Sequence, residues 1–259
     1  MIPLFSKPKV VSEKDNRAVF EIEALYPGYG VTVGNSLRRV LISSLPGAAV
    51  AKMRIKGVAH EFSTIPGVFE DVIQIMLNLK KLRFKMFSDE PQKAILKVRG
   101  EKDVKGKDVE IPSQMELVNK EEHIASLTAK SAELEMEIEV EKGIGYLPRE
   151  KRKREKLNVG EILVDSIFTP VVKVGFQVEN MRVGERTDFD KLILDVQTDG
   201  TISPQQALFQ ASQILVDHFS LINQSFKAED EKPKAKKPGK PVSKKAKKAS
   251  KPKKKPKKK

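Results

Sequence analysis

The chain has 259 residues, enough for one or two domains, and its lack of cysteine excludes disulfides, thiol catalysis and thiolate metal sites. Its net charge of +14 is confined to residues 227–259, with 17 lysines against three acidic residues, because residues 1–226 carry 32 basic and 32 acidic side chains. No apolar run approaches the roughly 18–20 residues that span a bilayer and no signal peptide is evident, so we expect a soluble cytoplasmic protein with no membrane partner.

The first predicted element is a strand followed by a turn. Phe20, Ile22 and Ala24 alternate with less apolar neighbours, which is the period of two expected of a half-buried strand. Pro27-Gly28 then predicts a turn.

A glycine-rich segment comes next, with Gly28, Gly30 and Gly34 leading into a helix that we expect to be capped by Asn35 or Ser36. Loops of this kind often hold phosphates. The Gly-Lys-Ser/Thr ending of a phosphate-binding loop is missing, and the spacing G-x-G-x-x-x-G does not match a dinucleotide fingerprint. A small nucleotide-binding enzyme is therefore a rival hypothesis rather than the preferred one.

The helix after this segment has two different faces and ends at Pro46-Gly47. Its apolar face consists of Leu37, Val40, Leu41, Ser44 and Leu45, and its other face of Arg38, Arg39 and Ile42. Exposed arginines on a rigid helix suit the carboxylates of a protein partner.

The middle of the chain, residues 47–169, has a different pattern of predicted elements. One helix pattern runs from Val68 to Leu79, with Pro66 near its start. In residues 132–142 four apolar residues alternate with five glutamates, which predicts an antiparallel strand with one face in water. A solvated face explains these glutamates better than a catalytic carboxylate cluster.

The last patterned region predicts two strands, at residues 172–178 and 192–196, and a long helix. Ser203-Pro204 supplies an N-cap and a first-turn proline for that helix. Its apolar residues cover more than one face, so part of them needs cover from elsewhere. We predict a homodimer, and the alternative is that the middle region covers this stripe. The predicted dimer interface is Leu37, Leu41, Leu208, Leu215 and Phe219.

No catalytic or metal-binding arrangement emerges. His60, His123 and His218 are scattered, and we interpret His218 as a packing residue on the apolar helix face. Asp188 and Asp190 have the spacing of a metal pair but no further ligands nearby, so turn residues are the better interpretation. We expect no cofactor and no active site.

The composition of residues 227–259 predicts a disordered tail, because Lys, Pro and Ala cannot supply a core. Lysines neutralise phosphates without reading bases, so the tail is a candidate for sequence-independent DNA binding. The alternative is a solubilising tail. A histone-like nucleic-acid binder is a rival for the whole chain, but the neutral charge of residues 1–226 argues against it.

Four motifs resemble, in the same order, the alpha subunit of bacterial DNA-directed RNA polymerase. They are GYGVTVGNSLRRVLISSLPG, GVAHEFSTIPGVFEDVIQIMLNLKKL, KGIGYLP and VENMRVGERTDFDKLILDVQTDGTISPQQAL, and the resemblance covers residues 1–226. It implies an α+β fold in which residues 1–46 and 170–226 form a discontinuous dimerisation domain and residues 47–169 an inserted, mostly β domain. It also implies that the glycine turn binds no nucleotide and instead leads into the helix on which the enzyme is assembled.

The resemblance further implies a homodimeric, non-catalytic scaffold for the beta and beta-prime subunits of a nucleotidyltransferase. The positions that match the beta-facing surface are Arg39, Ile42 and Gln74. Those that match the beta-prime-facing surface are Lys80, Val164, Val171 and Lys191. The family commonly continues into a C-terminal domain that reads upstream DNA, whereas this sequence continues into lysine repeats.

Overall fold

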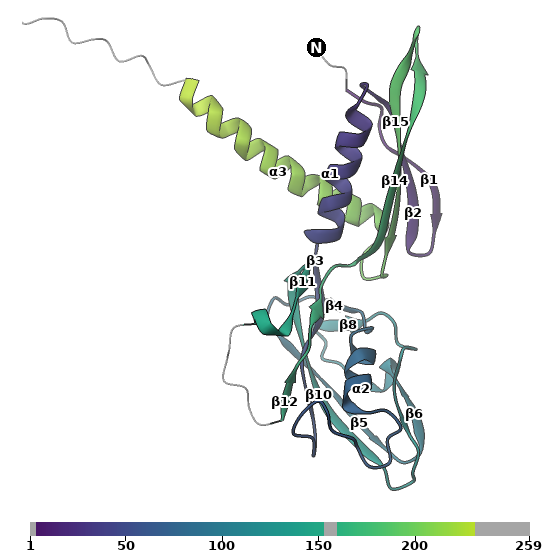
Figure 1. Cartoon of the computed structure of the whole chain (residues 1–259), viewed down its shortest axis with the longest axis vertical. Coiled ribbons are helices and arrows are strands. Elements are labelled where there is room, and N and C mark those ends of the chain that lie inside the picture. The colour runs from purple at the N-terminus through teal and green to yellow at the C-terminus, as the bar shows by residue number, and fades with distance from the viewer. Residues whose placement is uncertain (1–3, 153–159, 231–259) are drawn as a thin grey trace, which may run out of the picture. The chain divides into compact units, whose positions relative to one another are not determined.

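The computed structural model describes residues 4–152 and 160–230, with side chains to residue 226 (Figure 1). The chain divides into two units, residues 1–219 and 220–259. Helix α3 (Pro204–Asp230) extends past Lys227, so the first four residues of the predicted tail are helical rather than disordered. This corrects the predicted start of the tail. Residues 231–259, on which the predicted disorder and DNA binding mainly rest, lie outside the described residues.

One antiparallel sheet joins the two ends of the folded chain. Its strand order is β1 (Lys9–Lys14), β2 (Arg17–Leu25), β15 (Arg186–Thr198) and β14 (Val171–Val183). Phe20 and Ile22 are buried as the alternation predicts. Helices α1 (Tyr29–Ser43) and α3 share a hydrophobic core with this sheet.

Helix α1 packs unusually close to the sheet because two of its residues lack side chains. A Cβ atom added at Gly30 would lie 2.7 Å from Val178 Cγ1, and one added at Gly34 would lie 2.8 Å from the Phe176 ring. Both distances are shorter than van der Waals contact allows. The helix begins at Tyr29, so the prediction of Asn35 or Ser36 as its N-cap was wrong. Glycines disfavour helix when considered locally, whereas close packing on the sheet requires them here.

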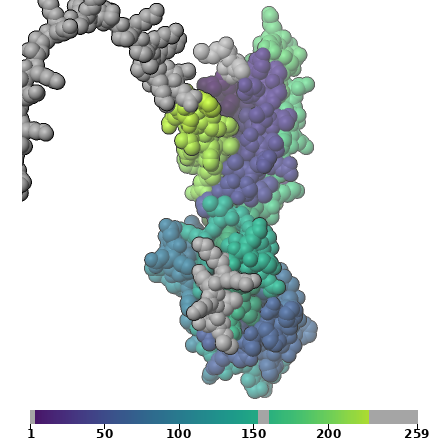
Figure 2. All heavy atoms as spheres, turned by 60° about the vertical axis from the view of Figure 1, so that its left-hand side comes forward, coloured from purple at the N-terminus to yellow at the C-terminus, as the bar shows by residue number. Residues whose placement is uncertain are grey.

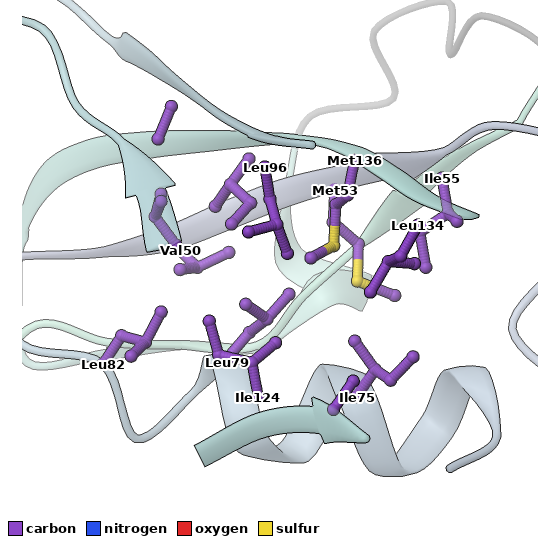
Figure 3. Packing of buried hydrophobic residues seen from close by; sticks show 14 of the residues in the cluster. Val50, Met53, Ile55, Ile75, Leu79, Leu82, Leu96, Ile124, Leu134 and Met136 are labelled. Atoms are coloured by element: carbon purple, nitrogen blue, oxygen red, sulfur yellow. The ribbon is translucent and has the colours of Figure 1, made fainter. Parts of the chain in front are cut away.

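A second, larger sheet of seven strands encloses the other main core. Along it run β7 (Val109–Glu110), β5 (Gln92–Arg99), β10 (Glu133–Ile144), β3 (Pro46–Ile55), β4 (Phe84–Met86) and β8 (Met115–Leu117), and β12 (Glu161–Leu163) pairs with β3. Helix α2 (Val72–Leu79) covers this core, with Ile75 and Leu79 directed toward the side chains of the sheet (Figure 3).

Shorter pieces complete the fold. Two strand pairs stand apart from the large sheets, β6 (Lys102–Lys105) with β9 (His123–Leu127) and β11 (Tyr146–Leu147) with β13 (Ser166–Ile167). Two single-turn 3₁₀ helices are η1 (Gly106–Asp108) and η2 (Arg149–Lys151).

The glutamate-rich strand is the solvated, antiparallel strand that the sequence predicts. The apolar residues of β10 from Leu134 to Val140 are buried against α2 and its neighbours, while the glutamates lie on the other face. Glu135 pairs with Lys56 of the loop after β3 at 2.8 Å and with Lys97 of β5 at 3.0 Å. Hydrogen bonds from these two ammonium groups lower the pKa of Glu135 to about 2.

Two local predictions need correction and one is confirmed. Helix α2 begins at Val72, later than predicted, because the Asp71 carboxylate accepts a hydrogen bond from the Gln74 N–H at 2.7 Å and caps it there. The alternation that predicts a strand at residues 172–178 would place Val172 on the buried face, whereas Val172 is exposed beside an irregularity in the β14 register. Ser203 caps α3 through its Oγ as predicted.

The close approach of α1 leads to a prediction about Gly34→Ala. An alanine in a helix interior normally stabilises by about 0.5–1 kcal/mol relative to glycine. Here the added methyl must displace the Phe176 ring, so we expect a net loss of roughly 1–3 kcal/mol in the free energy of unfolding, measured by urea denaturation. Gly175→Ala is the matched control, because nothing lies within 4 Å of its added Cβ. A Gly34→Ala variant as stable as wild type would contradict this packing account.

Candidate functional site

The glycine turn before α1 is occupied by a carboxylate of the protein itself. Asp190 Oδ2 accepts hydrogen bonds from the backbone N–H groups of Gly28 and Gly30, both at 2.9 Å. Gly28 has a φ of +84°, a conformation that favours glycine. These N–H groups are the donors that would otherwise face a phosphate. The turn therefore fixes the start of α1 to β15 through these two hydrogen bonds.

The two aspartates of the suspected metal pair have separate roles. Asp188 and Asp190 both lie within β15, so their interpretation as turn residues was wrong, and Asp190 is buried there. Asp188 forms an ion pair with Arg186 at 2.7 Å. Within residues 4–152 and 160–226, no group of three His, Asp or Glu side chains is arranged to hold a metal ion.

The histidines are likewise separate. His123 lies between Glu70 and Asp103, with nitrogen–oxygen distances of 2.8 and 2.9 Å, and His60 contacts Ser63. His218 is exposed on α3, which corrects its interpretation as a packing residue of the single chain. The apolar stripe predicted for α3 therefore includes positions that the core of a single protomer does not cover.

An apolar groove of about 660 Å³ runs between the start of α3, α1 and the strands β1 and β2. Figure 2 shows the yellow-green surface of α3 beside the purple surface of α1. The apolar residues that line it are Phe5, Pro8, Val10, Phe20, Ile22, Val33, Leu37, Leu208, Phe209, Leu215, Val216 and Phe219. Phe209 and Phe219 are 68% and 62% exposed, so the groove has large uncovered aromatic walls.

The residues predicted for the dimer interface divide into two groups. Leu208, Leu215 and Phe219 line the groove, and Leu37 lies buried at its floor. Leu41 is 0% exposed and packs in the protomer's own core, so its assignment to an interface needs correction. It lies one turn after Leu37, on the helix stripe that faces the sheet.

The positions matched to the beta-facing surface are all exposed. Arg39 and Ile42 lie on α1, and Gln74 lies on α2. The two helices belong to different hydrophobic cores. No contact described in the chain brings Gln74 to the other two residues.

The positions matched to the beta-prime-facing surface are mostly engaged within the chain. Lys80 pairs with Asp165 at 3.3 Å and Lys191 with Glu21 at 3.1 Å. Val164 and Val171 are buried in their respective cores, so their side chains present almost no surface to a partner. The burial of these two valines therefore corrects their assignment as beta-prime contact residues.

Comparison with known proteins identifies the family. The family model described as RNA polymerase Rpb3/RpoA insert domain matches residues 53–169. Three relatives carry the name DNA-directed RNA polymerase subunit alpha. That of Roseiflexus castenholzii is 50% identical over 216 residues, covering 83% of this chain and 66% of the relative. Those of Herpetosiphon aurantiacus and Carboxydothermus hydrogenoformans are 48% and 49% identical, with 87% and 83% of this chain and 67% and 69% of the relatives covered.

The chain belongs to the alpha-subunit family of bacterial DNA-directed RNA polymerase. It spans about two thirds of the length of the relatives it matches. In the part of the chain that the structure describes, no helix is both long and apolar enough to cross a membrane.

Sequence reasoning missed several groove residues of this alpha-family chain. Three of them lie in or just before β1, namely Phe5, Pro8 and Val10. The apolar pattern there is too short to predict a structural element. Phe209 and Val216 belong to the apolar stripe of α3, and a full count of that stripe would have found them.

Proposed function

We propose that this protein is a homodimeric scaffold that assembles the beta and beta-prime subunits of DNA-directed RNA polymerase. The observation that carries the proposal is the open apolar groove between α1, α3 and the β1–β2 pair in a chain of the alpha-subunit family. The family names of the relatives support the assignment to the polymerase.

A second copy of the chain fits this groove best. Leaving a large apolar side chain in water instead of burying it forgoes about 1.5–3 kcal/mol. Phe209, Val216 and Phe219 are all exposed in the single chain, on the same helix that forms a groove wall. In a two-fold dimer the same surface serves both protomers, so α3 of each copy can fill the groove of the other.

The two hydrophobic cores support the proposed division into a dimerisation domain and an insert. One core uses residues from Ala18 to Leu45 and from Val171 to Ala211, and the other uses residues from Val50 to Val164. We propose boundaries at residues 1–46 plus 170–226 for the first domain and 47–169 for the second.

Within the polymerase the chain acts as a non-catalytic subunit that needs no cofactor. Its contacts with beta run through Arg39, Ile42 and Gln74, and the contacts with beta-prime lie around Lys80 and Lys191. Arg39 makes no ion pair with any other described residue, so it is available for a partner's carboxylate.

A second role concerns the lysine-rich segment after α3. The 16 lysines of residues 231–259 give this segment the charge needed to bind DNA through phosphates, without reading bases. We propose that it raises the affinity of the polymerase for DNA of any sequence.

The dimer proposal predicts the effect of Leu215→Glu with Phe219→Glu. Two carboxylates placed in the apolar groove would lose their hydration on pairing, so we expect monomer or aggregate in analytical ultracentrifugation. Phe62→Glu is the control, since Phe62 is exposed outside the groove and its variant should remain dimeric. A well-behaved wild-type monomer at micromolar concentration would refute the dimer.

The beta contact predicts that Arg39→Ala keeps the dimer but loses capture of the beta subunit in a pull-down. The side chain is exposed and makes no internal ion pair, so its removal should cost docking and not folding. Arg54→Ala removes another exposed arginine, from β3, and should behave as wild type. Full capture by Arg39→Ala would show that the assigned position is wrong.

The tail role predicts that truncation after Asp230, which keeps α3 whole, leaves assembly and catalysis intact. Affinity of the assembled polymerase for DNA should fall equally on all sequences, and more at low salt than at high salt, because counterion release drives the binding. Fluorescence anisotropy with two unrelated duplexes measures this. Unchanged affinity at low salt, or a loss confined to one sequence, would speak against the proposal.

A further inference from the structure

The strand pair β11–β13 presents an apolar surface that no described part of the chain covers. Tyr146 and Ile167 are direct cross-strand partners, so their side chains lie on the same face. Tyr146 is 59% exposed, and Ile144, at the end of β10, is 61% exposed. We name Ile144, Tyr146 and Ile167, together with Ile42 at the end of α1, the ribbon surface.

The ribbon surface adjoins the last turn of α1. A Cβ atom added at Gly145 would lie 3.3 Å from the Ser43 carbonyl oxygen, so the chain between Ile144 and Tyr146 passes directly beside the helix end. Ser43 follows Ile42 and donates a hydrogen bond from its Oγ to the Arg39 carbonyl at 2.7 Å. The strand pair and the exposed side of α1 thus form neighbouring parts of one surface.

Buried polar groups hold the strand pair rigidly. Ser166 Oγ donates to the Val50 carbonyl at 2.8 Å and accepts a hydrogen bond from Arg152 at 2.7 Å. The Arg152 side chain is only 9% exposed and also pairs with Glu141 at 2.7 Å. Two residues after Ser166, the Phe168 N–H donates a hydrogen bond to the Gly145 carbonyl oxygen at 2.8 Å.

This rigidity bears on binding. A two-stranded pair is marginally stable in water by itself, and here its inner side is fixed by the hydrogen bonds of Ser166. Its outer side nevertheless leaves an aromatic and an aliphatic side chain in solvent. Binding to a surface that is already ordered loses little conformational entropy, which favours affinity.

The charges around the ribbon surface indicate the chemistry of its partner. The carboxylates of the neighbouring segments already form ion pairs within the chain. These pairs are Glu141 with Arg152, Glu150 with Arg149 and Asp165 with Lys80. By contrast, Arg38, Arg39 and Lys151 are exposed and make no ion pair with another described residue. An apolar centre beside unpaired cations complements a protein segment that carries apolar and acidic side chains.

We propose that the ribbon surface binds an acidic, apolar segment of the beta subunit, which extends docking from α1 onto β11 and β13. The inference rests on the proposed function, because it takes the partner that α1 is proposed to bind. A nucleic acid is the less suitable occupant, since phosphates would use the cations and leave the apolar centre uncovered.

The test compares affinities of the purified dimer for the purified beta subunit by biolayer interferometry. Tyr146→Ser with Ile167→Ser should weaken binding at least about tenfold, as expected for loss of a central apolar contact, with dimer mass and melting temperature unchanged. Tyr146→Phe with Ile167→Leu keeps the apolar surface and should bind as wild type does. Phe62→Ser with Phe87→Ser removes two exposed aromatic rings elsewhere and should also have no effect.

Charge provides a second measurement. Wild-type affinity should fall as salt increases, and Arg38→Ala should reduce this dependence. If wild type binds beta and the Tyr146/Ile167 double variant binds equally well, the inference fails while the proposed function stands. If wild type does not bind beta at all, the proposed function fails and the inference with it. A double variant that loses affinity for duplex DNA and not for beta would also overturn the inference.

Discussion

Helix α1 lies so close to β14 and β15 that side chains at Gly30 and Gly34 would overlap Val178, Phe176 and Leu192. The Asp190 carboxylate completes this contact because it accepts hydrogen bonds from the backbone N–H groups of Gly28 and Gly30. With one side of the helix fixed in this way, its other side faces outward. Both the groove wall and the row of Arg38, Arg39 and Ile42 depend on that orientation.

Both sheets carry ion pairs on their solvent-exposed faces, although their cores are separate. In the large sheet the glutamates of β10 lie beside lysines and arginines of neighbouring strands, and Arg99 with Glu133 repeats the pairing of Glu135. In the small sheet Arg17 pairs with Asp195. Paired exposed charges of this kind add little stability, but they make the exposed faces of both sheets polar. The surfaces left apolar are therefore distinct from their surroundings.

Two such apolar surfaces divide the proposed work of the scaffold. The groove of α3 is wide and lined by aliphatic and aromatic residues, which suits a permanent contact between copies. The ribbon surface is smaller and lies beside unpaired cations, which suits a partner that is chosen by charge as well as by shape. Under this proposal, the different chemistry of the two surfaces would keep self-association and partner docking from competing.

The sequence by itself determined the features that depend on local periodicity and local hydrogen bonds. Alternation located β10 and β2, Ser203 located the start of α3, and the over-wide stripe of α3 indicated an uncovered face. Only the tertiary structure decided where α1 begins, that Asp190 caps it from 160 residues away, and that Leu41, Val164 and Val171 are buried. The reason is physical: a cap contributed by a distant strand and a glycine required by close packing leave no trace in the neighbouring residues. Burial, likewise, depends on which elements meet in space.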